Sequence, residues 1–168
     1  MTATRSGLIF LHGLMGSSQG VKATLLRKIF PHILTPDFSG SLEERMSALD
    51  EILAGESGWK IVGSSFGGLM AALFACQHPD QVDRLVLLAP ALIWPDFAAS
   101  PLAPVEVPVV IYHGSRDELI PLATARELAE RIFPNLSFNV VDDDHGLFQT
   151  VHALDWPAIL AEPAIDNA

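Results

Sequence analysis

The stretch at residues 60–76 constrains the fold of this chain more than any other. It reads KIVGSSFGGLMAALFAC, a short apolar run that ends in Gly-x-Ser-x-Gly and continues into an apolar, alanine-rich segment. A buried strand that turns sharply into a helix has this form, and the central Ser65 then projects from the tip of a sheet on a strained backbone. Gly63 and Gly67 have a steric role in such a turn, because a Cβ at either position would collide with the strand or helix packed beside it. The same letters also suit a plain loop between a strand and a helix.

The length and composition of the chain predict one globular domain over residues 1–168. Nearly half of the residues are hydrophobic, which argues against disorder. The formal net charge of −10 disfavours nucleic acid and anionic membranes as partners. Pro90 interrupts the longest uncharged run, so we expect no membrane insertion, and residues 1–16 are more typical of a first strand than of a signal peptide. These features predict a soluble cytoplasmic protein, in which the single Cys76 is a small buried hydrophobe.

Apolar runs and helical patterns alternate along the whole chain. Strands are expected at residues 8–11, 32–36, 60–63, 84–90, 107–114 and 136–141. Helices are expected at residues 21–29, 42–53, 69–76, 121–132 and 147–160, and Ser41 with Glu44 indicates a capping box before the second helix. The alternation predicts an α/β fold with about six mostly parallel strands and helices on both faces of the sheet.

One segment, residues 91–105, departs from this alternation. It carries three prolines, at residues 95, 101 and 104, together with Trp94 and Phe97, in the place where a helix is expected. It can line an acyl pocket as a minimal lid, or it can be a connecting loop whose aromatic side chains cover the edge of the sheet.

Two further polar groups follow later strands and are candidates to activate Ser65. A serine is a weak nucleophile until a base removes its proton and a carboxylate orients that base. Asp117 follows the strand at 107–114, and His145 follows the strand at 136–141, so all three can meet at the carboxyl edge of the sheet. The aspartates at 142–144 are also near His145, but a sequence neighbour rarely turns its carboxylate onto the adjacent ring, and Asp117 is favoured. A metal site at residues 142–145 is the weaker alternative, because no spaced ligands accompany it.

These motifs, in this order, resemble those of the α/β-hydrolases. Residues 11–18, Leu-His-Gly-Leu-Met-Gly-Ser-Ser, with Lys-Ala-Thr-Leu-Leu at residues 22–26, are most similar to small bacterial YqiA-type esterases, and the resemblance covers nearly the whole chain. It implies an oxyanion hole made by the backbone N–H groups of Leu14, in the first loop, and Phe66, after the serine. The chain lacks the two N-terminal antiparallel strands and the large cap of bigger relatives, and its implied strand order is 2-1-3-4-5-6.

The resemblance implies a serine hydrolase of the carboxylesterase or thioesterase kind, with a small-molecule ester or thioester substrate of short or medium acyl chain and no metal or organic cofactor. Ser65 is then the nucleophile, His145 the base and Asp117 its orienting acid. We call residues 13–20, which carry Leu14, the oxyanion loop. The residues expected near the substrate are His12, Met15, Trp94 and Phe97, and His12 is expected to hold the oxyanion loop rather than to act as a base. A lyase or carbon–carbon bond hydrolase with the same triad, and a non-catalytic binding protein of the same fold, are the alternatives.

Overall fold

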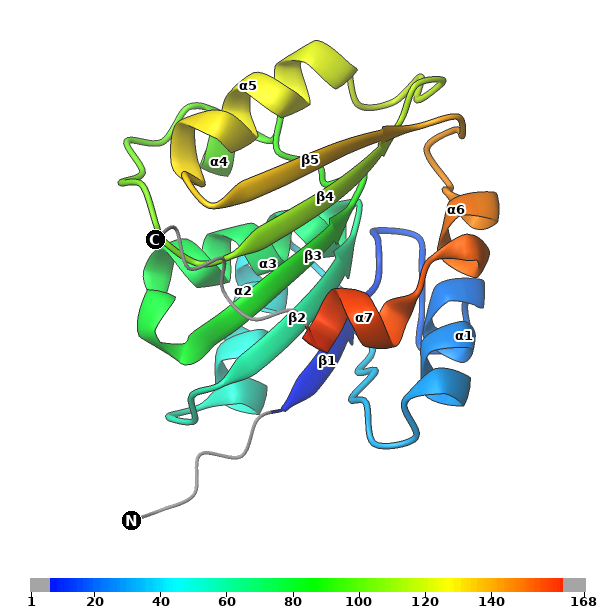
Figure 1. The fold of residues 1–168 in the computed structure, drawn as a ribbon. Helices are drawn as coiled ribbons and strands as arrows, with labels where there is room; N and C mark the ends of the chain where they lie inside the picture. The colour runs from blue at the N-terminus through cyan, green and yellow to red at the C-terminus, as the bar shows by residue number, and fades with distance from the viewer. Residues whose placement is uncertain (1–6, 162–168) are drawn as a thin grey trace.

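A five-stranded sheet forms the centre of the computed structural model, which describes residues 7–161 (Figure 1). Its strands, in spatial order, are β1 (Leu8–Leu11), β2 (Trp59–Ser64), β3 (Val82–Leu88), β4 (Val109–Gly114) and β5 (Leu136–Val141). Every neighbouring pair is parallel. The carboxyl ends of all five strands therefore lie at one edge of the sheet, where the loops that follow them meet.

Helices cover both faces of this sheet, as the alternating pattern predicts. The helical elements are α1 (Val21–Ile29), α2 (Leu42–Leu53), α3 (Phe66–Gln77), the 3₁₀ turn η1 (Pro79–Gln81), α4 (Pro95–Ala98), α5 (Leu122–Ile132), α6 (Phe148–Ala153) and α7 (Trp156–Ala161). Helices α1, α6 and α7 lie on one face and α2, α3 and α5 on the other (Figure 1). Within residues 7–161, no helix has the length and apolar character needed to cross a membrane.

The strands are buried on both faces because successive side chains enter two different core clusters. In β1, Ile9 and Leu11 pack with α2 and α3, whereas Phe10 between them packs with α1 and α6. Helix α3 is apolar all round and buried from Phe66 to Ala75, because it lies between the sheet and its neighbouring helices. The sharp turn between β2 and α3, called the elbow below, therefore leads directly into a buried helix.

The predicted strand at residues 32–36 is wrong, so the sheet has five strands rather than six. Only Leu34 pairs with the sheet: its N–H donates to Leu8 O, and its carbonyl accepts from Phe10 N–H, both at 2.9 Å. Pro36 has no N–H with which to extend this ladder, and Ile33 N–H bonds to Phe30 O within a turn. The predicted order 2-1-3-4-5-6 is corrected to β1-β2-β3-β4-β5, with Leu34 as a one-residue bridge beside β1.

Several other predictions concern the ends of elements and the loops between them. The capping box of α2 is confirmed, since Glu44 N–H donates to Ser41 Oγ and the Glu44 carboxylate accepts from Ser41 N–H. The single helix expected at 147–160 is instead two short helices, α6 and α7. The segment at 91–105 contains only the short helix α4. The predicted domain also takes in residues 1–6 and 162–168, which lie outside the described residues.

Candidate active site

Ser65 occupies the sharp turn between β2 and α3. Its backbone has φ 54° and ψ −112°, a conformation that residues other than glycine rarely adopt. Two hydrogen bonds to the neighbouring strand end hold it there: Ser65 N–H donates to Leu88 O, and Ser65 O accepts from Ala91 N–H, each at 2.9 Å. The turn fixes the direction of the serine side chain before any other group contacts it.

Gly63 and Gly67 allow the close packing that this turn requires. A Cβ at Gly63 would lie 2.5 Å from Gly67 O, and a Cβ at Gly67 would overlap the carbonyl oxygen of Leu11. Both obstacles are backbone atoms, which cannot rotate away as a flexible side chain can. The spacing of the glycines on either side of Ser65 is thus a steric requirement of the fold.

A continuous chain of hydrogen bonds joins Ser65, His145 and Asp117, although they come from three separate loops. His145 Nε2 lies 2.9 Å from Ser65 Oγ, and His145 Nδ1 lies 2.8 Å from Asp117 Oδ2. An ionised carboxylate can only accept, so Nδ1 carries the proton, and in the neutral ring Nε2 is free to accept from the serine hydroxyl. This is the tautomer that a general base needs.

Asp117 is held as a carboxylate by its surroundings. Its Oδ1 accepts from the N–H groups of Leu119 and Ile120 at 2.9 and 2.8 Å. Burial alone would raise the pKa of Asp117, but these two hydrogen bonds and the one to His145 lower it below its ordinary value. His113, fully buried, adds its Nε2 at 3.5 Å from Asp117 Oδ2 while it bonds to Ile120 O. Asp117 can therefore orient the imidazole and stabilise a positive charge on it.

The three aspartates before His145 have other partners. Asp142 pairs with Arg116 at 3.0 Å on the surface, and Asp144 Oδ1 accepts from Gly146 N–H. Asp143 is buried and accepts from Asp144 N–H, Thr150 N–H and Thr150 Oγ1. Asp143 thus fastens the loop that carries His145. Among residues 7–161 no group of three or more His, Cys, Asp or Glu side chains is placed to hold a metal ion.

Two backbone N–H groups lie at positions suited to an oxyanion hole. Phe66 is the first residue of α3, and Leu14 lies in the loop after β1; within the described residues neither amide donates a hydrogen bond. Gly13 O, on the peptide that carries the Leu14 N–H, accepts from Gly16 N–H at 3.1 Å and from His12 Nδ1 at 2.7 Å. In a trans peptide the N–H points opposite to the C=O, so these bonds fix the direction of the Leu14 N–H.

His12 is buried beneath this loop and is one of the residues that line the cavity between the loop and Phe148. Its place among the substrate-binding residues stays a prediction. Its Nε2 accepts from Phe38 N–H at 2.9 Å while Nδ1–H donates to Gly13 O, so the ring is neutral and both nitrogens are occupied. A second tie joins Ser18 to Asp37, whose carboxylate accepts from the Ser18 amide and hydroxyl at 2.6 and 2.8 Å. The oxyanion loop is therefore anchored to residues 37–38 at two points.

The other predicted substrate contacts divide into exposed and buried residues. Met15, in the oxyanion loop, is 95% exposed, and Trp94 is 41% exposed, with its ring edge-on to Phe66 at a centroid distance of 5.2 Å. Phe97 is fully buried against Phe133, so its prediction as a substrate contact is wrong. Met15 and Trp94 are available at the rim of the site, whereas Phe97 belongs to the core.

Two hollows lie near the candidate site, and one of them is lined by triad residues. A cavity of about 190 Å³ lies between the oxyanion loop, Ser64 and Phe148. Lys22 lines it, with Nζ 4.9 Å from the centroid of the Phe148 ring; burial lowers the pKa of Lys22, and the nearby Asp143 and Asp144 oppose that shift. A broader depression runs beside Asp117 and His145. The depression has Asp117 and His145 in its lining, whereas the cavity is lined by Ser64, the neighbour of Ser65, and by no triad residue.

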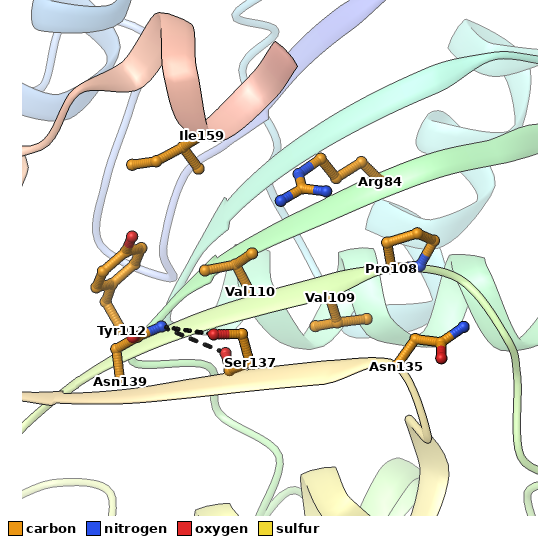
Figure 2. Close-up of a pocket in the computed structure, with 9 residues that line it drawn as sticks. All are labelled: Arg84, Pro108, Val109, Val110, Tyr112, Asn135, Ser137, Asn139 and Ile159. Atoms are coloured by element: carbon orange, nitrogen blue, oxygen red, sulfur yellow. Dashed lines mark hydrogen bonds between the residues drawn. The ribbon is translucent and has the colours of Figure 1, made fainter. Parts of the chain in front are cut away.

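A third hollow, of about 270 Å³, lies apart from this site. Figure 2 shows it over β3, β4 and β5, beside Ile159 of α7, with the amide of Asn139 donating to the backbone and hydroxyl oxygens of Ser137. Arg84 and Tyr112 are among its other lining residues, and no triad residue takes part. It is therefore not part of the candidate active site.

The sequence did not reveal two contributors to the site. Arg45, on α2, reaches the oxyanion loop and the ring of Phe66, and Phe148 closes the cavity beside Lys22. A charged residue in a capped amphipathic helix ordinarily faces solvent, so the pattern around Arg45 gave no signal for burial. For Phe148, its position three residues after His145 was the available signal.

Comparisons with known proteins agree with this architecture. A sequence profile of the alpha/beta hydrolase fold matches residues 35–103. Similar solved structures include the mouse alpha/beta hydrolase domain-containing protein 10, with a TM-score of 0.75 and 20% identity over 90% of this chain and 87% of that chain. Another is an alpha/beta-superfamily protein of Xanthomonas campestris pv. campestris, with a TM-score of 0.73 and 27% identity over 90% of this chain and 93% of that chain. The chain has the α/β-hydrolase fold.

Other proteins with the α/β-hydrolase fold are also similar to this chain. The monoacylglycerol lipase of Paleococcus ferrophilus has a TM-score of 0.67 and 18% identity over 90% of this chain and 92% of that chain. The search of curated protein sequences found no match. The comparisons thus support the superfamily that the motifs indicate, whereas the YqiA-type subfamily stays a prediction.

Proposed function

We propose that this protein is a serine hydrolase that cleaves small carboxylic esters or thioesters through an acyl-enzyme. The observation that carries the proposal is the hydrogen-bonded chain from Ser65 Oγ through His145 to Asp117. It is supported by the amides of Leu14 and Phe66, which donate to no acceptor within residues 7–161. The α/β-hydrolase fold and the presence of a lipase among its structural neighbours support hydrolysis as the reaction class.

In the first half of the reaction, Ser65 Oγ attacks the carbonyl carbon and its proton passes to His145 Nε2. The electron pair of the carbonyl moves onto oxygen, and the Leu14 and Phe66 N–H groups donate to the resulting oxyanion. Each such donor contributes about 3 kcal/mol in the transition state. When the oxyanion collapses, the bond to the alcohol or thiol breaks, and the leaving group takes the proton from His145.

In the second half, water attacks the acyl-enzyme carbonyl while His145 Nε2 accepts a proton from it. Collapse of this second oxyanion breaks the bond to Ser65 Oγ, which recovers its proton from His145, and the carboxylic acid leaves. Asp117 keeps its negative charge throughout and stabilises the imidazolium through Nδ1–H. None of these steps uses a metal or an organic cofactor.

A neutral ester of short or medium acyl chain is the favoured substrate. Among the basic residues near the first loop, Lys22 lies over Phe148, and Arg27 bonds to Ser18 O and Thr35 Oγ1. The exposed Lys28 is the third basic residue there, and the three together are a local feature that would favour the phosphates of a coenzyme A thioester. The net charge of −10 disfavours so anionic a group. Membership of the YqiA-type esterases and a cytoplasmic location stay predictions from the sequence.

The test is the hydrolysis of p-nitrophenyl esters from acetate to palmitate by the wild type and by Ser65→Ala. We expect the folded variant to lose about a thousandfold or more in kcat, and the preferred ester to report the size of the acyl site. Covalent labelling by a fluorophosphonate should occur in the wild type alone. Labelling without ester hydrolysis would favour a lyase or carbon–carbon bond hydrolase, and neither activity nor labelling would favour a binding protein.

A further inference from the structure

Arg45 is a buried arginine without an ion-pair partner. It is 5% exposed, and within the described residues no carboxylate lies within 4.0 Å of its guanidinium. Nε donates to Gly40 O at 3.1 Å and Nη2 to Leu14 O at 3.3 Å. Nη1 is buried and has no hydrogen-bond partner. Glu44, its neighbour in the sequence, forms no ion pair with it, and the Glu44 carboxylate accepts from Ser41 N–H in the capping box.

A buried guanidinium without an ion-pair partner lowers the stability of the folded state, so its presence requires an explanation. The guanidinium keeps its charge at any physiological pH. An unpaired charge in the interior loses its hydration without a compensating partner, and native proteins rarely leave a buried donor unsatisfied. Folding alone would be served at least as well by an apolar side chain of similar length at this position.

The contacts of Arg45 connect the two halves of the proposed oxyanion hole. Its Nη2 bonds to the carbonyl of Leu14, and its Cζ lies 5.3 Å from the centroid of the Phe66 ring, a cation–π arrangement. Leu14 and Phe66 are the residues whose N–H groups face the reacting carbonyl in the proposed function. One side chain from α2 therefore touches both proposed oxyanion residues, of which Leu14 lies in the loop after β1 and Phe66 at the start of α3.

We propose that Arg45 is a positioning residue that holds Leu14 and Phe66 in fixed positions relative to each other. Its unpaired charge also stabilises the oxyanion from the buried side of these two residues. Because Nη1 has no access to solvent, Arg45 acts through these two residues and through its field rather than by contact with substrate. A fixed charge in the protein interior needs no reorganisation as the oxyanion forms, which is the condition for effective electrostatic stabilisation. This inference rests on the proposed serine hydrolase function.

The test compares Arg45→Met with Arg45→Lys and with the control Arg131→Met. Arg131 also donates to two backbone carbonyls, those of Phe97 and Ala98, but it is exposed and lies on α5. For each variant we would measure kcat and KM on the best p-nitrophenyl ester, the thermal midpoint, and the inhibition constant of an alkyl trifluoromethyl ketone. Addition of Ser65 to that ketone forms a bound oxyanion, whereas the matching alkyl alcohol serves as an uncharged control ligand.

For Arg45→Met we expect kcat to fall about tenfold to a hundredfold with KM nearly unchanged. The inhibition constant of the ketone should rise by the same factor, and that of the alcohol should stay unchanged. The thermal midpoint should stay equal or rise, because an apolar replacement removes an unpaired buried charge. Arg45→Lys should recover part of kcat, and Arg131→Met should match the wild type. An unchanged kcat, or a fall in kcat with equal weakening of ketone and alcohol, would overturn the proposal.

Failure of the proposed function has a different signature. If the wild type and Ser65→Ala are equally inactive, the electrostatic part of the inference fails with the function. The positioning part is then judged by NMR: the amide signals of Leu14 and Phe66 should shift and exchange faster in Arg45→Met than in Arg131→Met. Unchanged signals for both amides would overturn that part as well.

Discussion

Replacement of Asp117 by Asn tests the proposed proton arrangement through geometry already present in the site. Asp117 uses one oxygen, Oδ1, for the N–H groups of Leu119 and Ile120, and the other, Oδ2, for His145 Nδ1. Asparagine has one oxygen and one NH₂ group. Two backbone donors face the Oδ1 position, so the amide oxygen must occupy it, which turns the NH₂ group toward His145.

The NH₂ group can only donate, so His145 must present a bare Nδ1 to it and carry its proton on Nε2. That nitrogen faces Ser65 Oγ at 2.9 Å and can then no longer accept the serine proton. We expect a loss of about 10⁴ in kcat, the size seen when a triad imidazole is held in the wrong tautomer. This loss corresponds to about 5 kcal/mol of transition-state stabilisation.

The assay is ester hydrolysis at neutral pH, with urea unfolding to show that the variant is folded. Asp142→Asn is the matched control, since that side chain is 91% exposed and pairs with Arg116 on the surface. It should keep wild-type activity. A folded Asp117→Asn that keeps more than about a tenth of the activity would refute the proposed tautomer control.

Three further predictions concern stability and reactivity. Gly67→Ala should cost about 3 kcal/mol in the free energy of unfolding, because its Cβ would overlap Leu11 O; an unchanged urea midpoint would contradict this packing. Burial alone would raise the pKa of Asp143, but hydrogen bonds, the first of them from Thr150 N–H, lower it below its ordinary value. The ionised Asp143 therefore stabilises the folded state fully above the ordinary aspartate pKa, and this contribution is lost as the pH falls through the lowered pKa. Asp143→Asn should therefore lose about 1–3 kcal/mol at neutral pH and show a shallower decline on acidification in urea titrations; an equal decline would argue against this role. Burial raises the pKa of the Cys76 thiol to about 11, so a disulfide reagent should label it at neutral pH only after unfolding, and rapid labelling of native protein would contradict this expectation.

The elbow could be predicted from sequence because its requirements are local. A strand, a serine with positive φ and a helix succeed one another within a few residues, and Gly63 is needed because a Cβ there would meet Gly67 O. The obstacle at Gly67 is Leu11 O, on the neighbouring strand, so this one requirement is tertiary. The meeting of Ser65 with Asp117 and His145 depends instead on groups 80 and 28 positions apart. It could be anticipated only because parallel strands bring their carboxyl ends to one edge of the sheet.

Other features depend on tertiary contacts that local patterns do not encode. Residues 32–36 have the composition of a strand, but Pro36 and the turn at Ile33 limit their pairing to Leu34. Aromatic residues in a proline-rich segment can face either way: Trp94 turns to the site and Phe97 to the core, where Phe133 offers a stacking partner. Hydrophobicity alone does not distinguish the two directions.

The open form of this site gives Arg45 a particular significance. Between β3 and β4 the structure has only the short helix α4, and Met15 and Trp94 at the rim are exposed to solvent. Water near the reacting carbonyl weakens the hydrogen bonds of an oxyanion hole, and many enzymes counter this by closing a lid. A charge fixed on the buried side of the hole acts through the low-dielectric interior and needs no lid. We therefore expect the loss caused by Arg45→Met to be similar for short and long esters, since the field reaches the carbonyl whatever the acyl chain covers. A loss confined to short esters would instead assign the effect to water exclusion by the substrate itself.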